Sequence, residues 1–580
     1  MYKPKGLYLL AIAVLVAMMV PVISLIVGIT SFREIGAPTF TFLSFIRSSY
    51  ALGLTENSLE FSIVHAALGI TLATFYAWVV ARSDIPWKRF FELLPILGLT
   101  QPLEVKVFAW IFLADPHVGM LNILLKSLLG SSAPLLDIYG MGGMIWVAMI
   151  GAVPLAYLII MPAMKSMDPS LEEASRIAGR GTLSTFYSIT VRVLWPAILV
   201  AFLLSTLSGL AIFDYPYFLG QPAGVHTLST EVYYWAEGVA PPSYGNAGVI
   251  SILFVIITAI TVSLYIWATR KTNKYITVSG RSERHVYFKL RRWKPLAIFA
   301  CSLIVFFEFF LPFTALLLES FSNISITHSF QNLNINFPSA YIQAIHIPGF
   351  FPSLKATIEF GVATAAILTL ISALLSFATL KVKTRAARLT EFVTSIPLAI
   401  PGIVFGVALT WMFLIVPGLN RFYGSLVPLV FALVVIRLPY TTRIISANLF
   451  QISNELEEAS QVAGSKFRKT FTRITLPLIK GGLINSFVYA LVDSMRELGA
   501  VVLLSSSTAM PFTSLLLNYY EVHNVTGNVL AAGSVILTGL IIIILLTLVI
   551  VERLTGRRRY KETSPIQESV RLLNEKEPNA

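Results

Sequence analysis

Charged residues are scarce in this chain of 580 residues: they make up 13 %, whereas hydrophobic residues make up 56 %. A water-soluble domain of this length does not tolerate such a balance, since about a quarter of the residues of a soluble domain are charged. The only cysteine is Cys301, which excludes a disulfide framework and a cluster of metal-binding thiolates. The composition therefore predicts a protein that crosses a membrane several times.

Sequence motifs for ATP binding, metal binding and catalysis are also missing. The chain contains no Gly-x4-Gly-Lys-Ser/Thr loop, so it does not cradle ATP in that way. It contains no His-Glu-x-x-His or paired-aspartate motif, and its histidines show no ligand spacing such as His-x-x-x-His. We therefore expect no enzyme activity, no metal site and no cofactor in this chain.

Long apolar runs account for most of the sequence, and a transmembrane helix needs about 20 such residues. The runs of this length in the first half are 7–29, 58–81, 91–114, 141–164, 194–218 and 246–269. Those in the second half are 296–318, 354–379, 391–416, 425–448, 481–504 and 529–551. The sequence therefore predicts an all-α membrane protein with twelve transmembrane helices, six in each half.

The net charge of +13 is unevenly distributed along the chain. Residues 270–294 hold nine Lys or Arg and a single acidic residue, Glu283. The segments without any Lys or Arg are 220–245, 319–353 and 505–528. Because basic loops stay in the cytoplasm, we expect both termini to be cytoplasmic and the protein to cross the inner (cytoplasmic) membrane many times. We interpret the basic stretch as a contact with lipid headgroups rather than with nucleic acid, because apolar runs flank it on both sides.

One short sequence occurs twice. Residues 171–179 read Leu-Glu-Glu-Ala-Ser-Arg-Ile-Ala-Gly, and residues 456–464 read Leu-Glu-Glu-Ala-Ser-Gln-Val-Ala-Gly. Each copy lies in a polar, basic gap between apolar runs, which indicates a gene duplication with both copies in the cytoplasm. An even number of spans per half makes the halves parallel repeats. The predicted parts are a first repeat (1–269), a basic linker (270–295), a second repeat (296–555) and a disordered cytoplasmic tail (556–580).

Each copy carries the signals of a short helix followed by a break. Asp168 and Pro169 precede the first copy, and proline favours the first helical position. Acidic residues crowd both first turns, where the helix dipole favours negative charge. Gly179 and Gly464 then let the backbone leave helical geometry and turn back toward the membrane.

This pattern resembles the EAA loop of the membrane subunits of ABC importers, which reads Glu-Ala-Ala, three residues, Gly, nine residues and Ile-x-Leu-Pro. The second copy (loop 453–477) matches it at Glu458, Ala459, Gly464, Ile474, Leu476 and Pro477. The first copy (loop 168–192) keeps Glu173, Ala174, Gly179 and Ile189, but has Val191 and Arg192 in place of Leu-Pro.

The resemblance implies a MetI-like type I ABC permease fold and a role as the membrane subunit of an ATP-driven importer. Two copies of a separate ABC ATPase would bind the ATP, and an extracytoplasmic substrate-binding protein would deliver a small solute. The residues implied to couple to the ATPases are Glu172, Glu173, Ala174, Gly179, Glu457, Glu458, Ala459 and Gly464. The alternative is that two amphipathic cytoplasmic helices recur only because the membrane fold was duplicated.

The fused layout is similar to that of the ferric iron permeases and of related permeases for thiamine or aminoethylphosphonate. The patches that carry this similarity are 213–216, 219–222, 227–230 with Tyr233, and 494–499. Ferric iron is therefore the first expected substrate, and phosphonates, thiamine and polyamines remain open.

Ionisable residues inside the apolar runs mark cavities or partners, because a charge inside a membrane is costly. The densest group is Asp493, Arg496 and Glu497, whose spacing of three and four residues fits one face of a helix over 481–504. This group either fixes the span as an ion pair, with Arg437 as a partner, or contacts the substrate. The residues predicted to line the substrate path are Asp214, Arg437, Asp493, Arg496 and Glu497. The other candidates are His65, Glu104, Lys106 and Glu308, of which Glu104 and Lys106 either neutralise one another or line the cavity.

A secondary transporter driven by protons or sodium is the main rival. Such proteins with twelve spans usually carry Gly-x-x-x-Asp-Arg-x-Gly after the second span, whereas residues 82–89 read Arg-Ser-Asp-Ile-Pro-Trp-Lys-Arg. The missing motif favours the ATP-driven importer.

Overall fold

The computed structural model describes residues 12–24, 41–130, 136–272, 288–322, 335, 337–381, 394–450, 452, 454–465, 467–521 and 525–562. Helices form nearly all of its regular structure, and the described residues pair as strands only in isolated bridges. The prediction of an all-α membrane protein is confirmed.

The first half consists of long apolar helices joined by short ones. Its α-helices include Ile12–Ser24, α2 (Phe42–Ile46), α3 (Ser49–Arg82), α4 (Lys88–Leu93), α5 (Leu103–Ala114), α6 (Met120–Leu129), α7 (Met141–Ser166), α8 (Ser170–Ile177), α9 (Thr182–Thr185), α10 (Val191–Ala211), α11 (Leu228–Tyr233) and α12 (Tyr244–Thr272). A 3-10 helix, η1 (Leu94–Thr100), joins α4 to α5, and a π-helical turn, η2 (Phe186–Thr190), joins α9 to α10.

The second half repeats much of this order. Its α-helices include α13 (Lys294–Val305), α14 (Leu311–Phe321), α16 (Ser339–His346), α17 (Phe350–Lys381), α19 (Gly402–Ile415), α20 (Leu426–Phe450), α21 (Asn454–Val462), α22 (Phe467–Thr470), α23 (Leu476–Leu478), α24 (Lys480–Met495), α25 (Phe512–Glu521) and α26 (Gly527–Glu562). The π-helical turns η7 (Phe306–Phe310) and η10 (Phe471–Thr475) lie between α13 and α14 and between α22 and α23.

The described helices include eight that are long and apolar enough to cross a membrane, or up to ten if each of two bent pairs counts as one span. The runs predicted at 7–29 and 391–416 coincide with shorter apolar helices, Ile12–Ser24 and α19. Several crossings of the membrane are therefore confirmed. The finer prediction of twelve spans in two repeats of six is not decided by this count.

Two of the predicted spans are not straight. The run 91–114 is bent by 95° between η1 and α5, where Pro102 holds Gln101 in an extended conformation. The run 481–504 is also wrong as a single helix, because α24 ends at Met495. A 75° bend precedes this run, between the helical segment Arg468–Leu478 and α24. The bend before α5 and the end of α24 place Glu104 and Glu497 next to helix ends.

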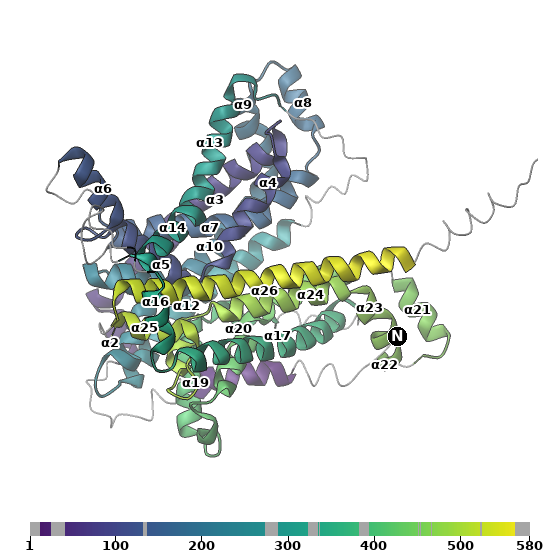
Figure 1. Ribbon diagram of the computed structural model, residues 1–580. Helices are drawn as coiled ribbons and strands as arrows, with labels where there is room; N and C mark the ends of the chain where they lie inside the picture. Colours follow the sequence, from purple (N-terminus) through teal and green to yellow (C-terminus); the bar gives the residue numbers. More distant parts are fainter. Residues whose placement is uncertain are drawn as a thin grey trace, which may run out of the picture.

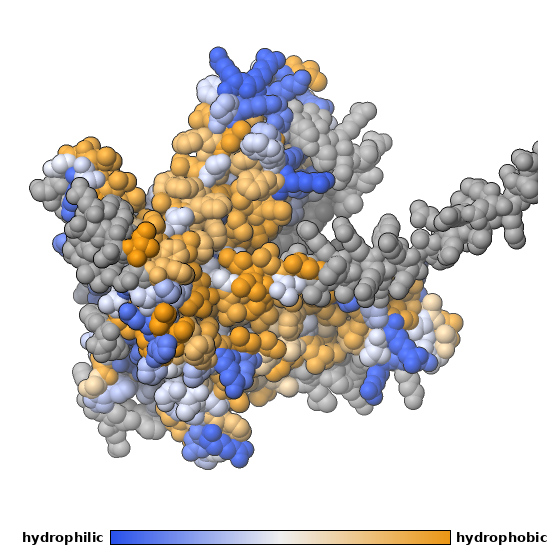
Figure 2. Space-filling model, viewed as in Figure 1, coloured by the Kyte–Doolittle hydropathy of each residue, from blue (hydrophilic) through white to orange (hydrophobic). Residues whose placement is uncertain are grey.

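The two halves form two arms that meet at one end (Figure 1). Helices α3, α7 and α10 pack together in the first arm, and α17, α20 and α24 do so in the second. Figure 1 shows α8 and α9 at the far end of the first arm and α21 and α22 at the far end of the second. In Figure 2, hydrophobic surface covers the arms and hydrophilic surface gathers at their ends, as expected for a membrane protein with two polar ends.

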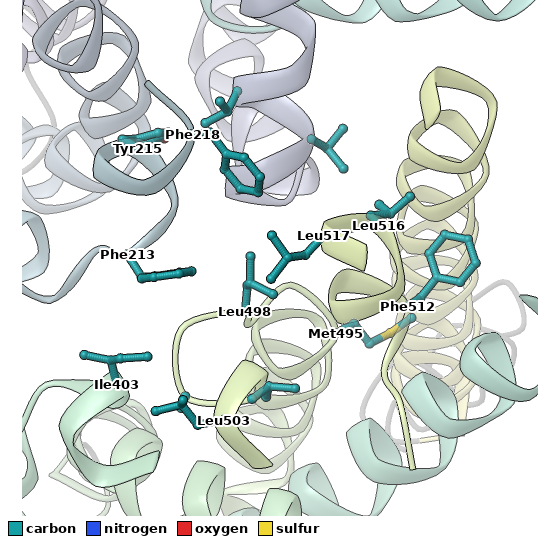
Figure 3. Packing of buried hydrophobic residues seen from close by; sticks show 14 of the residues in the cluster. Phe213, Tyr215, Phe218, Ile403, Met495, Leu498, Leu503, Phe512, Leu516 and Leu517 are labelled. Atoms are coloured by element: carbon teal, nitrogen blue, oxygen red, sulfur yellow. The ribbon is translucent and has the colours of Figure 1, made fainter. Parts of the chain in front are cut away.

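The first helices of the second half lie against the first arm. Helix α13 packs on α3 and η1, and α14 packs on α5 and α26. One large apolar core joins the arms where they meet, and Figure 3 shows Phe213 of the first half in the same cluster as Ile403 and Leu498 of the second. The two halves therefore share their core and are interlocked.

Candidate coupling loops and translocation site

The first repeated sequence folds into the predicted short helix, α8. The backbone N–H of Ser170 donates to Oδ1 of Asp168 (2.9 Å), and this bond lowers the pKa of the Asp168 carboxyl because it stabilises the charged form. Past the helix end, Gly179 has a φ of +83°, a conformation that costs glycine little. The hydroxyls of Ser175 and Thr185 lie 3.0 Å apart and join α8 to α9.

The second repeated sequence, in α21, builds the same turn. Gly464 has a φ of +76°, and the hydroxyls of Ser460 and Thr470 lie 2.9 Å apart. A π-helical turn follows in both loops, η2 in the first and η10 in the second. The two loops therefore share their local geometry although the first lacks the Leu-Pro of the motif.

Large aliphatic side chains of both helices are exposed at matching positions. Leu171 is 45 % exposed and its counterpart Leu456 is 50 % exposed. Ile177 is 87 % exposed and its counterpart Val462 is 90 % exposed. Exposed aliphatic side chains at matching positions of the two loops indicate a surface that is made to be covered by a partner.

The acidic residues of the two helices differ in exposure. Glu173 is half-buried and Ala174 is exposed, and Glu458 and Ala459 are exposed. Glu172 instead points inward: its side chain is 4 % exposed and its Oε1 accepts a hydrogen bond from Oγ1 of Thr190 (2.6 Å). The side chain of Glu457 lies outside the described part of the structure.

The predicted charged cluster forms, but with a different geometry. Arg437 of α20 contacts the carboxylates of both Asp493 and Glu497. Glu497 lies beyond the end of α24, and its Oε1 accepts a hydrogen bond from the backbone N–H of Ala500 (3.1 Å). The prediction that one helix face carries all three residues is wrong, because α24 ends at Met495 and the chain turns there. Arg496 is not part of this ion-pair network, and its buried Nε has no hydrogen-bond partner in the described part of the chain.

A second acidic pair lies beside this cluster, in the first half. Glu104 begins α5 just after its bend and is fully buried, and Asp214 follows the end of α10 and is 4 % exposed. The charges that act on Glu104 are those of Asp214, Arg496 and Glu497. Both carboxylate oxygens of Glu104 and Oδ1 of Asp214 lack a hydrogen-bond partner among the described residues. The residues predicted to line the path are thus gathered together, and Glu104 joins them.

Two further buried charged residues of the apolar runs are Lys106 and Glu308. Nζ of Lys106 donates to the backbone carbonyl of Gly98 (3.4 Å), and the acidic group whose charge acts on it is Glu308 of η7. No ion pair joins Lys106 to Glu104 among the described residues, so the prediction that these two neutralise one another is wrong. His65 is buried in α3, where its Nδ1 lies 2.8 Å from the carbonyl of Phe61.

Broken helices meet at the acidic cluster. A Cβ atom on Gly499 would lie 3.4 Å from Cβ of Phe213 and 3.5 Å from Oε1 of Glu497, so the break after α24 touches the break after α10 (Figure 3). Broken helices at mid-membrane depth expose backbone and polar groups to a substrate path in many transporters. Within the described residues, no group of three or more His, Cys, Asp or Glu is arranged to hold a metal ion.

Parts of this sequence are similar to known transport proteins. Residues 365–558 match the family model of the inner membrane component of binding-protein-dependent transport systems. A ferric transport system permease of Actinobacillus pleuropneumoniae is 27 % identical over 509 residues, which cover 86 % of this chain and 71 % of that protein. An Fe(3+)-transport system permease of Haemophilus influenzae is 25 % identical over 469 residues, which cover 78 % of this chain and 81 % of that protein.

A permease named for a different substrate matches a shorter part of this chain. A sulfate transport system permease of Synechococcus elongatus is 25 % identical over 233 residues, which cover 38 % of this chain and 80 % of that protein. The predicted resemblance to a fused ABC importer permease, similar to the ferric permeases, is confirmed by these matches.

Proposed function

We propose that this chain, which resembles the fused permeases of ferric ABC importers, is the membrane-spanning subunit of an ATP-driven importer. In this proposal it forms two parallel repeats of six spans, 1–269 and 296–555, joined by the basic linker 270–295 and followed by the tail 556–580. Both termini and both loops face the cytoplasm in the inner membrane. The chain itself carries no ATPase site and no cofactor.

The observation that carries this proposal is the matched exposure of Ile177 and Val462. Covering a large aliphatic side chain contributes roughly 2 kcal/mol, and each loop also presents a leucine and an acidic residue next to it. We propose that each loop inserts these side chains into one of two copies of an ABC ATPase. Glu173, Ala174, Glu458 and Ala459 make the contact, and Gly179 and Gly464 fix the angle of each loop.

The movement of the two loops drives alternating access. ATP binds the closed ATPase pair more tightly than the open pair, so ATP shifts the equilibrium toward the state in which the two loops lie close together. The arms meet at their other end, and closing their loop-bearing ends opens the opposite side to a substrate-binding protein. Hydrolysis of ATP then restores the state in which the arms diverge.

The substrate passes the broken helices where the arms meet. Asp214, Asp493 and Glu497 place three acidic side chains there, Glu104 adds a fourth, and Arg437 and Arg496 add two cations. The similarity to ferric permeases supports ferric iron as the substrate.

Reconstitution tests the proposed function directly. The chain is co-expressed with its neighbouring ATPase and binding-protein genes, purified and placed in proteoliposomes with radioactive ferric iron on the binding protein. We expect the ATPase to co-purify and uptake to require ATP. Uptake that proceeds without ATP, driven by a proton or sodium gradient, would instead establish the secondary transporter.

A further inference from the structure

One side chain at the cytoplasmic end of α3 connects three helices. Nη2 of Arg82 donates to the backbone carbonyls of Met164 (2.9 Å) and Met167 (2.8 Å), which are at the end of α7. Its Nε lies 3.4 Å from Oε2 of Glu172 in the first coupling helix. The side chains of Arg82 and Glu172 are 6 % and 4 % exposed, so both lie inside the protein.

The other carboxylate oxygen of Glu172 binds the end of the same loop, just before α10. Its Oε1 accepts the hydrogen bond from Thr190, the last residue of η2, which leads into α10. Thr190 is fully buried. The carboxylate of Glu172 therefore joins α8 to the start of α10, while its ion pair with Arg82 joins α8 to α3 and α7.

The start of the second half lies against the same group of helices. The backbone N–H of Phe288 donates to the carbonyl of Arg82 (3.0 Å), and its ring stacks on Trp78 with 4.9 Å between ring centroids. Two residues on, the N–H of Leu290 donates to Oδ1 of Asp84 (2.8 Å). Lys294, the first residue of α13, pairs with the same carboxylate (2.9 Å).

We propose that Arg82 and Glu172 form a joint that transmits movement of the first coupling helix to α3 and α7, and through Phe288 to α13 of the second half. Glu172 is thus a positioning residue inside the loop and does not contact the ATPase. The chain itself links α8 to α7 through residues 167–169 and to α10 past the glycine break, but it does not link α8 directly to α3. The joint adds a non-covalent path to α3, because a buried guanidinium that donates to two carbonyls and lies 3.4 Å from a carboxylate holds its partners in one geometry.

The inference rests on the proposed function, and it predicts a specific loss. Glu172→Gln keeps the shape of the side chain and its bond with Thr190 but removes the charge that pairs with Arg82. Residues along a coupling path change coupling by roughly two- to thirtyfold when they are altered. We therefore expect Arg82→Gln and Glu172→Gln to lower the number of ferric ions imported per ATP hydrolysed by that factor, while the ATPase still co-purifies and hydrolyses ATP.

The experiment measures ferric iron uptake and ATP hydrolysis in the same proteoliposomes for the wild type, each single variant and the double variant. If the two residues act through each other, the double variant loses no more coupling than the stronger single variant. Lys355→Gln, which removes an exposed charge in α17, is the control and keeps the wild-type ratio. Thr190→Val is a milder variant for the case that Arg82→Gln does not fold, and it lowers the ratio in the same direction.

Two other outcomes are informative. If the variants only lower the melting temperature and keep the wild-type ratio of iron to ATP, the joint is purely structural and the inference is overturned. If the wild type itself neither binds the ATPase nor needs ATP for uptake, the proposed function fails, which is a separate result.

Discussion

The carboxylate of Glu308 occupies the space that a side chain at Gly98 would need: a Cβ atom on Gly98 would lie 1.4 Å from Oε1 of Glu308. Glu308 comes from the second half and Gly98 from the bend in the first, and both are buried. The interlocking of the two halves thus depends on a position without a side chain.

We predict that Gly98→Ala destabilises the protein by about 2 kcal/mol, because overpacking a filled interior costs roughly this amount. The measurement is thermal unfolding of the purified protein in detergent. Gly53→Ala in α3 is the matched control, since its Cβ would meet nothing within 4 Å. Equal melting temperatures for both variants would mean that Glu308 moves aside freely.

Arg437 contacts two carboxylates, so we expect its loss to destabilise the protein more than the loss of one of these carboxylates. Arg437→Gln leaves Asp493 and Glu497 side by side without a cation, and we expect a loss of about 3 kcal/mol of stability. Glu497→Gln leaves the pair between Arg437 and Asp493 in place, so this variant should unfold at a higher temperature than Arg437→Gln. We also expect Glu497→Gln to lower iron uptake while the complex still assembles. Uptake at the wild-type rate in that variant would remove Glu497 from the translocation path.

Substitution of Gly464 tests whether the angle at which the chain leaves α21 matters for coupling. A Cβ there would meet nothing within 4 Å, but the φ of +76° strains any other residue by about 1–2 kcal/mol. Gly464→Val should therefore leave folding intact, shift the exit of α21 and separate ATP hydrolysis from uptake. Gly481→Ala is the control, because Gly481 also has open space around its Cβ and no positive φ. If Gly464→Val imports iron normally, the angle at this residue does not transmit force.

The contacts of Asp84 predict that the stability of the folded protein depends on pH. The backbone N–H of Leu290 and then the ammonium of Lys294 lower the pKa of Asp84, because both stabilise its charged form. A group with a lowered folded pKa stabilises the protein above its unfolded pKa, about 4, and loses this effect as the pH falls through the folded pKa. The difference in melting temperature between the wild type and Asp84→Asn should therefore be full at pH 7 and shrink below about pH 4. A constant difference across this range would show that the charge of Asp84 is irrelevant.

The sequence alone predicted the parts of the molecule that depend on local patterns. The repeated motif placed α8 and α21 correctly, because helix-start signals and a glycine with positive φ are local features. Helix boundaries were less accurate: α3 begins at Ser49, where Ser48 caps it through the N–H of Ala51 (3.1 Å), although the apolar run begins only near residue 58. Polar residues in its first turns, such as Glu56 and Asn57, interrupt the apolar pattern from which the start of the helix was predicted.

Pairings between distant residues could not be predicted. The proximity of Glu308 to Gly98 and Lys106 is set by the way α13 and α14 pack on the first arm, and no spacing in the sequence reports that packing. The inward orientation of Glu172 was missed for the same reason, since both Glu172 and Glu173 were assigned to the ATPase contact, and the distant partners Arg82 and Thr190 are what hold Glu172 inside. The proline at position 102 was the available signal that Glu104 stands at a break, next to Asp214.

The most direct test of the account asks whether the two loops meet an ATPase in the cytoplasm. Cys301, the only cysteine, is buried and is replaced by alanine, and single cysteines are then introduced as Ile177→Cys and Val462→Cys. We predict that a membrane-impermeant thiol reagent labels both positions from the cytoplasmic side only, and that bound ATPase protects both from labelling. Labelling from the outside, or labelling that the ATPase leaves unchanged, would contradict the account.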